Sequence, residues 1–170
     1  AISALGSAIA RRLAASHLAG PSVDDALRMA ELFGARGWAC VIGPWVAPDS
    51  TPERNLELYG AAVEALASRG LDGYLSIKLS TIGYDDGMFA DLLARAARHG
   101  VRVHSDSIGP ETADRTMEMI GTAAARFRNV GATLPAGWRR SLADVSKLLE
   151  WGVAVRIVKG QWSDPAGPVP

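Results

Sequence analysis

The stretch Val155-Arg156-Ile157-Val158-Lys159-Gly160 is an apolar run that carries two cations and stops at a glycine. In a β-strand the side chains alternate between two faces, so Arg156 shares its face with Val158 and Gly160. A charge within so apolar a run costs free energy unless another group pairs with it. Arg156 is therefore the first candidate for a functional residue.

The composition is that of a globular domain. The chain has 170 residues, of which 48% are hydrophobic, and this is ample for one domain with its own core. Its 18 basic and 18 acidic residues cancel, so net charge does not favour nucleic acid. We expect a small-molecule substrate and no nucleic-acid partner.

The sequence also bears on compartment and context. Its single cysteine, Cys40, lies in an apolar run, which is typical of a structural thiol in a reduced compartment. The apolar runs are too short to span a bilayer, and no signal-peptide pattern opens the chain. We expect a cytoplasmic protein without a membrane span. Because the chain begins without methionine and ends in a proline-rich tail, we expect a longer parent chain, with a homo-oligomer as the other possibility.

Strand and helix patterns alternate along the chain. Apolar periodicity predicts helices at 2–18, 22–36, 51–68, 85–99, 109–120 and 141–151. Short apolar runs predict strands at 38–46, 71–80, 101–106, 130–134 and 155–160. Helix starts are marked by the pairs Ser22 with Asp25 and Ser141 with Asp144, which have capping-box spacing, and by Thr51 followed by Pro52.

This alternation predicts βα units around a parallel sheet. An open doubly wound sheet and part of a (β/α)8 barrel both fit the pattern. In either fold the carboxyl ends of the strands build the functional site. Polar residues recur at those predicted ends: Asp49, Lys78, Ser80, His104, Asp106, Arg139, Arg140, Arg156 and Lys159.

Each of these residues also has a purely structural interpretation. Lys78 could simply extend its ammonium from a strand end to water. His104 and Asp106 share a strand face at a spacing that could hold a metal, but two ligands do not make a metal site. We therefore expect no metal, and Arg156 remains the strongest functional candidate.

Segments in four places, in the same order, resemble the proline dehydrogenase family of FAD-dependent barrels. They are Ser76-Ile77-Lys78-Leu79-Ser80, the 101–106 strand with Pro110-Glu111-Thr112 after it, Arg139-Arg140-Ser141, and the opening stretch. The resemblance runs from about Gly37 to Trp162. It implies an α/β fold of the (β/α)8 TIM-barrel type, here about five βα units. Residues 1–36 would form an N-terminal helical lead-in, and residues 37–170 the first part of the barrel.

The resemblance also implies an activity. The family holds FAD at the carboxyl ends of its strands and oxidises L-proline by passing a hydride to flavin N5. By this resemblance Lys78 would lie beside the isoalloxazine and the substrate carboxylate, and Arg156 would lie near N5. Lys159 and Gly160 would support the cofactor, with Trp162 as the aromatic residue after them. The substrate would be L-proline or a related cyclic amino acid.

Several site positions depart from the family pattern. His104 and Asp106 stand where the third strand usually carries an aspartate and a glutamate, and we take both as catalytic candidates together with Lys78. Pro135 replaces a flavin-contacting glutamine, and Gln161 replaces a small residue. Two alternatives follow from these departures. One is a flavin-free relative that binds a small anion or metal through His104, Asp106, Arg139 and Arg156. The other is a degenerate barrel with a structural or assembly role.

Overall fold

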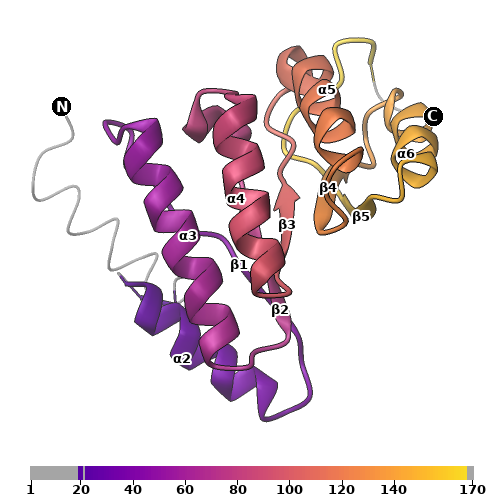
Figure 1. The fold of residues 1–170 in the computed structure, drawn as a ribbon. Coiled ribbons are helices and arrows are strands. Elements are labelled where there is room, and N and C mark those ends of the chain that lie inside the picture. The colour runs from indigo at the N-terminus through magenta and orange to yellow at the C-terminus, as the bar shows by residue number, and fades with distance from the viewer. Residues whose placement is uncertain (1–18, 21, 168–170) are drawn as a thin grey trace, which may run out of the picture.

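The computed structural model describes residues 19–20 and 22–167, and these residues form a curled sheet surrounded by helices (Figure 1). The sheet has five parallel strands in the order β1-β2-β3-β4-β5. Their bounds are β1 (Cys40–Ile42), β2 (Gly73–Ile77), β3 (Arg102–Ser105), β4 (Val130–Pro135) and β5 (Ala154–Val158).

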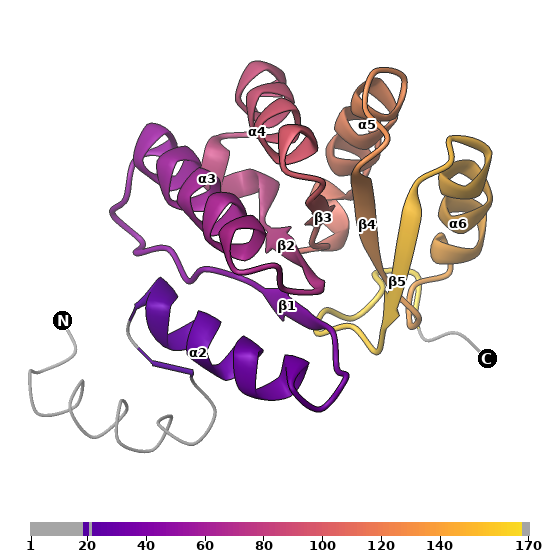
Figure 2. The ribbon, with the colours of Figure 1, turned by 60° about the horizontal axis from the view of Figure 1, so that its bottom comes forward.

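The helices lie around the outside of the sheet (Figure 2). They are α2 (Val23–Gly34), α3 (Pro52–Ser68), α4 (Asp86–Arg98), α5 (Ala113–Ala124) and α6 (Ser141–Glu150). Two short 3-10 turns, η1 (Leu79–Ile82) and η2 (Pro110–Thr112), follow β2 and β3.

This arrangement is that of a partial barrel. Each strand pairs in parallel with the next one in sequence, so spatial order follows chain order throughout the described sheet. A doubly wound sheet would instead reverse its strand order at a switch point. The predicted α/β class of the TIM-barrel type is thus confirmed for about five βα units, and the open-sheet alternative is wrong.

The N-terminal part is only partly described. The helix expected at 2–18 lies outside the described residues, whereas α2 begins at the predicted cap. Ser22 Oγ accepts a hydrogen bond from Asp25 N at 3.2 Å, and Ser22 N donates to Asp25 Oδ2 at 3.1 Å. This reciprocal pair is the expected capping box. The division into a lead-in at 1–36 and a barrel part at 37–170 stays a prediction.

Of the helix caps predicted at Thr51 and Ser141, the first is present in the structure and the second is not. At α3, Thr51 Oγ1 accepts from Arg54 N at 3.3 Å and proline follows the cap, as expected. At α6 the predicted capping box is wrong, because Ser141 is buried and its Oγ donates to the carbonyl of Pro135 at 2.6 Å. Pro135 is the last residue of β4 and lies close to the start of α6. The Ser141 hydroxyl therefore bonds to the strand carbonyl and does not cap a backbone N–H of the helix.

The two faces of the sheet differ in character. The outer face packs on the helices through fully buried side chains such as Leu75 and Val103, which are both 0% exposed. These residues meet Phe89 and Leu92 of α4 in one continuous core. The inner face carries the polar side chains, so the curvature of the sheet gathers them on its concave side. Within the described residues, no helix is long and apolar enough to cross a membrane.

Replacing Gly73 by alanine tests how closely β1 and β2 approach. A Cβ at this position would lie 2.6 Å from the carbonyl oxygen of Cys40 and 2.9 Å from its Sγ. Because backbone must shift to relieve this contact, we expect Gly73→Ala to lower the free energy of unfolding by about 1–3 kcal/mol in urea titrations. The control is Gly34→Ala in α2, where the nearest atom would be Leu71 Cδ2 at 3.9 Å. An equal effect of both substitutions would contradict the prediction.

Candidate functional site on the inner face of the sheet

The polar residues of the inner face come together because parallel pairing keeps matching positions in line. Ser76 of β2 aligns with His104 of β3, and Thr133 of β4 aligns with Arg156 of β5. His104 in turn aligns with Gly131 of β4. Since alternate residues share a face, these positions form one continuous inner surface.

Arg156 is the centre of this surface. Its Nε donates to Thr133 Oγ1 at 3.0 Å, and its Nη1 donates to the Tyr74 hydroxyl at 3.3 Å. Its Nη2 donates to Ser76 Oγ at 3.1 Å and also forms an ion pair with Asp106 Oδ1. The guanidinium therefore contacts side chains from two other strands and the carboxylate that follows a third. Such fork geometry is what an arginine supplies and a lysine does not.

Asp106 balances this charge. Its Oδ1 accepts from Ser76 Oγ at 2.7 Å and from Thr133 Oγ1 at 3.2 Å, besides pairing with Arg156. The side chains of Arg156 and Asp106 are 28% and 27% exposed, so the pair is only partly screened by water. Three donors converge on one oxygen, and this fixes the carboxylate in place.

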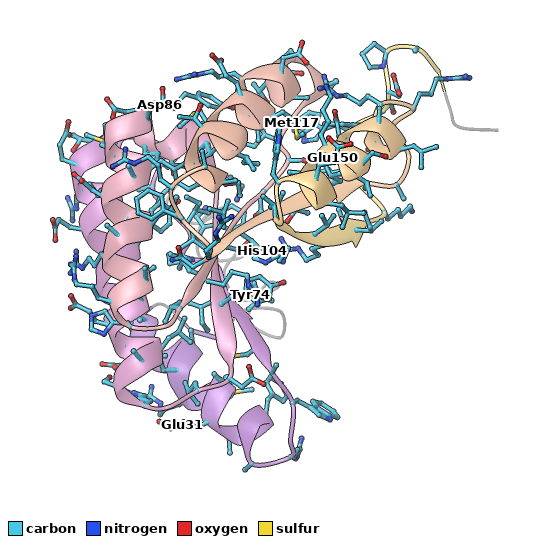
Figure 3. All side chains as sticks on the ribbon, turned by 45° about the vertical axis from the view of Figure 1, so that its right-hand side comes forward. Glu31, Tyr74, Asp86, His104, Met117 and Glu150 are labelled. Atoms are coloured by element: carbon cyan, nitrogen blue, oxygen red, sulfur yellow. The ribbon has the colours of Figure 1, made fainter. Side chains whose placement is uncertain are left out.

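His104 lies beneath this network. It is 3% exposed, and neither Nδ1 nor Nε2 has a hydrogen-bond partner among the described residues. Its ring lies 4.2 Å, centroid to centroid, from the ring of Tyr74, and Figure 3 shows the two labelled side chains beside each other. The ring also covers Gly131, where an added Cβ would lie 2.1 Å from His104 Cδ2.

This environment lowers the pKa of His104 to about 4. Burial is the largest cause, and the positive charges of Arg156 and Arg102 act in the same direction, while Asp106 opposes them. The imidazole is consequently neutral at pH 7. A neutral buried ring is a packing group and a potential hydrogen-bond partner, and it adds no positive charge to the site.

The remaining predicted residues lie at the carboxyl ends of their strands. Lys78 follows β2 and is exposed, with its Nζ 5.7 Å from the centroid of the Trp45 ring. Lys159 follows β5 and is exposed. Among the described residues, no hydrogen bond or ion pair joins either lysine side chain to Asp106, the carboxylate that pairs with Arg156. The structure thus brings Arg156, Asp106 and His104 into one cluster and leaves both lysines at its edge.

Gly160 and Trp162 shape the turn after β5. Gly160 has φ +87°, and a Cβ there would lie 2.6 Å from Pro135 Cβ, so only glycine fits. The carbonyl of Trp162 accepts from Trp138 Nε1 at 2.8 Å, while the Trp162 side chain is 51% exposed. The turn is therefore held through its backbone, and the indole of Trp162 remains available for contact.

Sequence reasoning missed three residues that hold Arg156. Tyr74 and Thr133 belong to predicted strands but carry no charge, and Ser76 was noticed only as part of a motif. Strand alternation was the signal that could have found them, because all three share the face of Arg156 once the register is known. Arg140, just before α6, forms ion pairs with Asp144 and Asp114.

The donor set of this surface suits an anionic, planar cofactor better than a metal. Lys78 and Lys159 directly follow β2 and β5, and Arg156 lies at the middle of β5, so three cations are available to an anionic group at this surface. Among residues 19–20 and 22–167, no group of three or more His, Cys, Asp or Glu side chains is placed to hold a metal ion. Asp106 is moreover already engaged by Arg156.

The fold and the site together define the class: a partial parallel βα barrel with a cation-rich surface at the carboxyl ends of its strands. No family model matches the chain. Curated relatives do match it, among them the proline dehydrogenase of Deinococcus radiodurans, which is 27% identical over 168 residues. That alignment covers 91% of this chain and 54% of the relative. Proline dehydrogenase 1 of Bacillus subtilis (strain 168) is 23% identical, with coverage of 88% and 52%.

Solved structures agree on the fold. Proline utilization A (PutA) from Bdellovibrio bacteriovorus superposes with a TM-score of 0.69 at 20% identity, covering 84% of this chain and 20% of that chain. A PutA structure with proline bound in remote sites gives a TM-score of 0.61 at 17% identity, with coverage of 72% and 16%. The chain is thus a relative of the proline dehydrogenases, as the resemblance predicted, and it spans about half the length of the curated relatives it matches.

The lowered pKa of His104 makes stability depend on pH. Between pH 6.5 and 4 the unfolded chain binds a proton at this residue and the folded chain does not, so acid favours unfolding. We expect the free energy of unfolding to fall by up to about 3 kcal/mol between pH 7 and pH 4 from this residue alone. The measurement is urea unfolding at several pH values, compared with His104→Leu, which should lack this part of the pH dependence. Identical pH profiles for the two proteins would contradict the assignment.

Proposed function

We propose that this chain is part of an FAD-dependent oxidoreductase that oxidises L-proline or a related cyclic amino acid. The observation that carries the proposal is the fixed Arg156 cluster on the inner face of a barrel-type sheet, in a chain whose curated relatives are named proline dehydrogenase. Bound FAD would supply the hydride acceptor at N5.

The role proposed for Arg156 follows from its charge and its fixed position. A reduced flavin carries added negative charge, which a nearby cation stabilises. Four side chains already orient the guanidinium, so little reorganisation is needed when charge develops beside it. Asp106 would keep Arg156 in place as a positioning residue, and it would also offset part of the positive charge.

The roles proposed for the lysines follow from their exposure at the strand ends. Lys78 would bind the carboxylate of the substrate, because an exposed ammonium can move to meet it. Lys159 would attract the cofactor from the end of β5, and Gly160 would keep the backbone free of a side chain there. Trp162 would offer its half-exposed indole to the ring system.

Pro135 changes how β4 can contribute. A proline has neither a side-chain donor nor a backbone N–H. The next backbone donor, Ala136 N, is already bonded to the carbonyl of Val158 at 2.7 Å. In this chain cofactor contacts would therefore come from β2 and β5 rather than from the end of β4. His104, being buried and neutral, would act on the site only through its packing against Tyr74.

A flavin titration tests the proposal. Purified protein should take up FAD and acquire a flavin absorbance spectrum, and anaerobic L-proline should bleach it as the flavin is reduced. A protein that takes up no FAD would refute the cofactor proposal. A bound flavin that proline does not bleach would refute the substrate proposal.

Substitution of Arg156 tests its role separately. We expect Arg156→Met to weaken FAD binding by about 10- to 100-fold, the range for loss of a charged hydrogen bond. Arg156→Lys keeps the positive charge but loses the several N–H donors of the guanidinium, so it should retain part of the affinity for FAD. The control is Arg98→Met on the exposed surface of α4, which should bind FAD normally. Equal FAD affinity in the wild-type protein and in Arg156→Met would contradict the assigned role, provided that circular dichroism shows the variant folded.

A further inference from the structure

An apolar patch lies at the end of the sheet formed by β5 and α6. Ile157 of β5 points to the outer face and is 54% exposed, whereas Leu134, its neighbour in β4, is 5% exposed and belongs to the core. Leu142 and Leu149 of α6 are also exposed. Several large apolar side chains exposed together on one surface mark an interaction site more than isolated ones do.

The two leucines lie on the flank of α6 that faces the open end of the sheet. The other flank packs against α5, because a Cβ at Gly121 of α5 would lie 2.9 Å from the ring of Trp151, the C-cap of α6. Leu142, Val145 and Leu149 follow one another at i, i+3 and i+7, so they form one stripe. At 100° per residue this stripe lies about 150° around the helix from Trp151. We call these three side chains the α6 stripe.

Next to the α6 stripe, β5 offers a free backbone edge. Its one neighbour in the described sheet is β4. The carbonyl of Val158 points toward β4, since it accepts from Ala136 N at 2.7 Å. Backbone groups of successive strand residues point to opposite sides, so those of Val155 and Ile157 point to the free edge. Unpaired N–H and C=O groups along a strand edge are a template for another strand.

The opposite edge of the sheet, at β1, is less suited to pairing. β1 has three residues, and a very short edge strand limits the number of bonds that another strand could form. β5 has five residues and contains no proline. Its one charged residue, Arg156, points to the inner face and is already paired with Asp106. The free edge of β5 is therefore open to a second strand.

A second copy of this chain is the partner that suits the patch. Ile157 and the α6 stripe carry no charge, so the patch can pack against its own copy without leaving a charge unpaired. Two copies related by a two-fold axis meet through the same surface, which is the commonest arrangement in homo-oligomers. A different protein would need both a free strand edge and an uncharged helix flank in matching positions, and a second copy has both by symmetry.

We infer that two copies of this chain form a dimer through antiparallel β5 strands, with Ile157 of each copy at the two-fold axis. The α6 stripes of the two copies pack beside the two Ile157 side chains on the outer face. In this register Val158 of the second copy lies opposite Arg156. A register centred on Arg156 would instead place two guanidinium groups opposite each other, and like charges in that position are destabilising.

The dimer bears on the candidate site as well as on the open edge. Arg156 lies in β5, so the strand of the second copy covers the side of the Arg156 cluster that faces the free edge. The inner faces of the two sheets lie on the same side of the joined sheet. Pairing of the strands needs no bound FAD, so the inference is independent of the proposed function.

The mass of the full chain in solution tests the dimer. In light scattering without FAD we expect about twice the 17.9 kDa of one chain. Ile157→Glu places two carboxylates together at the axis and should raise the dissociation constant of the dimer at least about tenfold. The matched control, Ala97→Glu on the exposed surface of α4, should leave it unchanged. Circular dichroism checks that both variants are folded.

Three results of this experiment would overturn the inference. They are a wild-type mass of one chain, a wild-type mass of more than two chains, and a folded Ile157→Glu variant that dimerises as tightly as the wild-type protein. A monomeric chain that still takes up FAD would leave the proposed function standing.

A disulfide tests the register without a change of charge. Cys40→Ser removes the single cysteine and supplies the background. Facing Cα atoms of an antiparallel pair lie about 5.5 Å apart, within reach of a disulfide, so Ile157→Cys should form a covalent dimer under mild oxidation. Val155→Cys, on the same face, is the control, because its two copies would lie about 13 Å apart in this register. Equal cross-linking of the two variants, or none in Ile157→Cys, would overturn the inference.

Discussion

The guanidinium of Arg156 is the contact on which the inner face depends. It joins β5 to Thr133 of β4, to Asp106 after β3, and to Tyr74 and Ser76 of β2. The pair is only partly buried, with side chains 28% and 27% exposed, so we expect its own contribution to stability to be modest. Its hydrogen bonds and ion pair nevertheless hold side chains of β2, β4 and β5 and the carboxylate after β3 in fixed relative positions. A sheet held in this way presents a preorganised cation at its concave side.

The outer face of the sheet provides most of the apolar packing, and the inner face carries the polar groups of the candidate site. The outer face is closed by helices and contains the fully buried apolar side chains. The inner face exchanges apolar packing for a polar network, with His104 inserted beneath it against Gly131. Because His104 is neutral, the positive charge of the surface belongs to Arg156 and to the lysines at the strand ends. Such a surface suits a carboxylate substrate and a cofactor that becomes negatively charged.

Much of the fold could be predicted from local pattern, because strands and helices are marked by periodicity over a few residues. The caps of α2 and α3 were predicted correctly for the same reason, since their partners lie within three residues. The cap of α6 was not, because Ser141 bonds to the end of a strand that local spacing does not place beside it.

The sequence by itself determined the alternation of strands and helices, the candidate cations Lys78, Arg156 and Lys159, and the resemblance to a family. Each of these can be read from a short segment or from the order of segments along the chain, so none requires knowing which strands are neighbours. Only the tertiary structure decided that Asp106 pairs with Arg156 and that Lys78 faces Trp45 instead. The physical reason is that register and sheet curvature set distances between residues far apart in the chain, and no spacing along the chain encodes them.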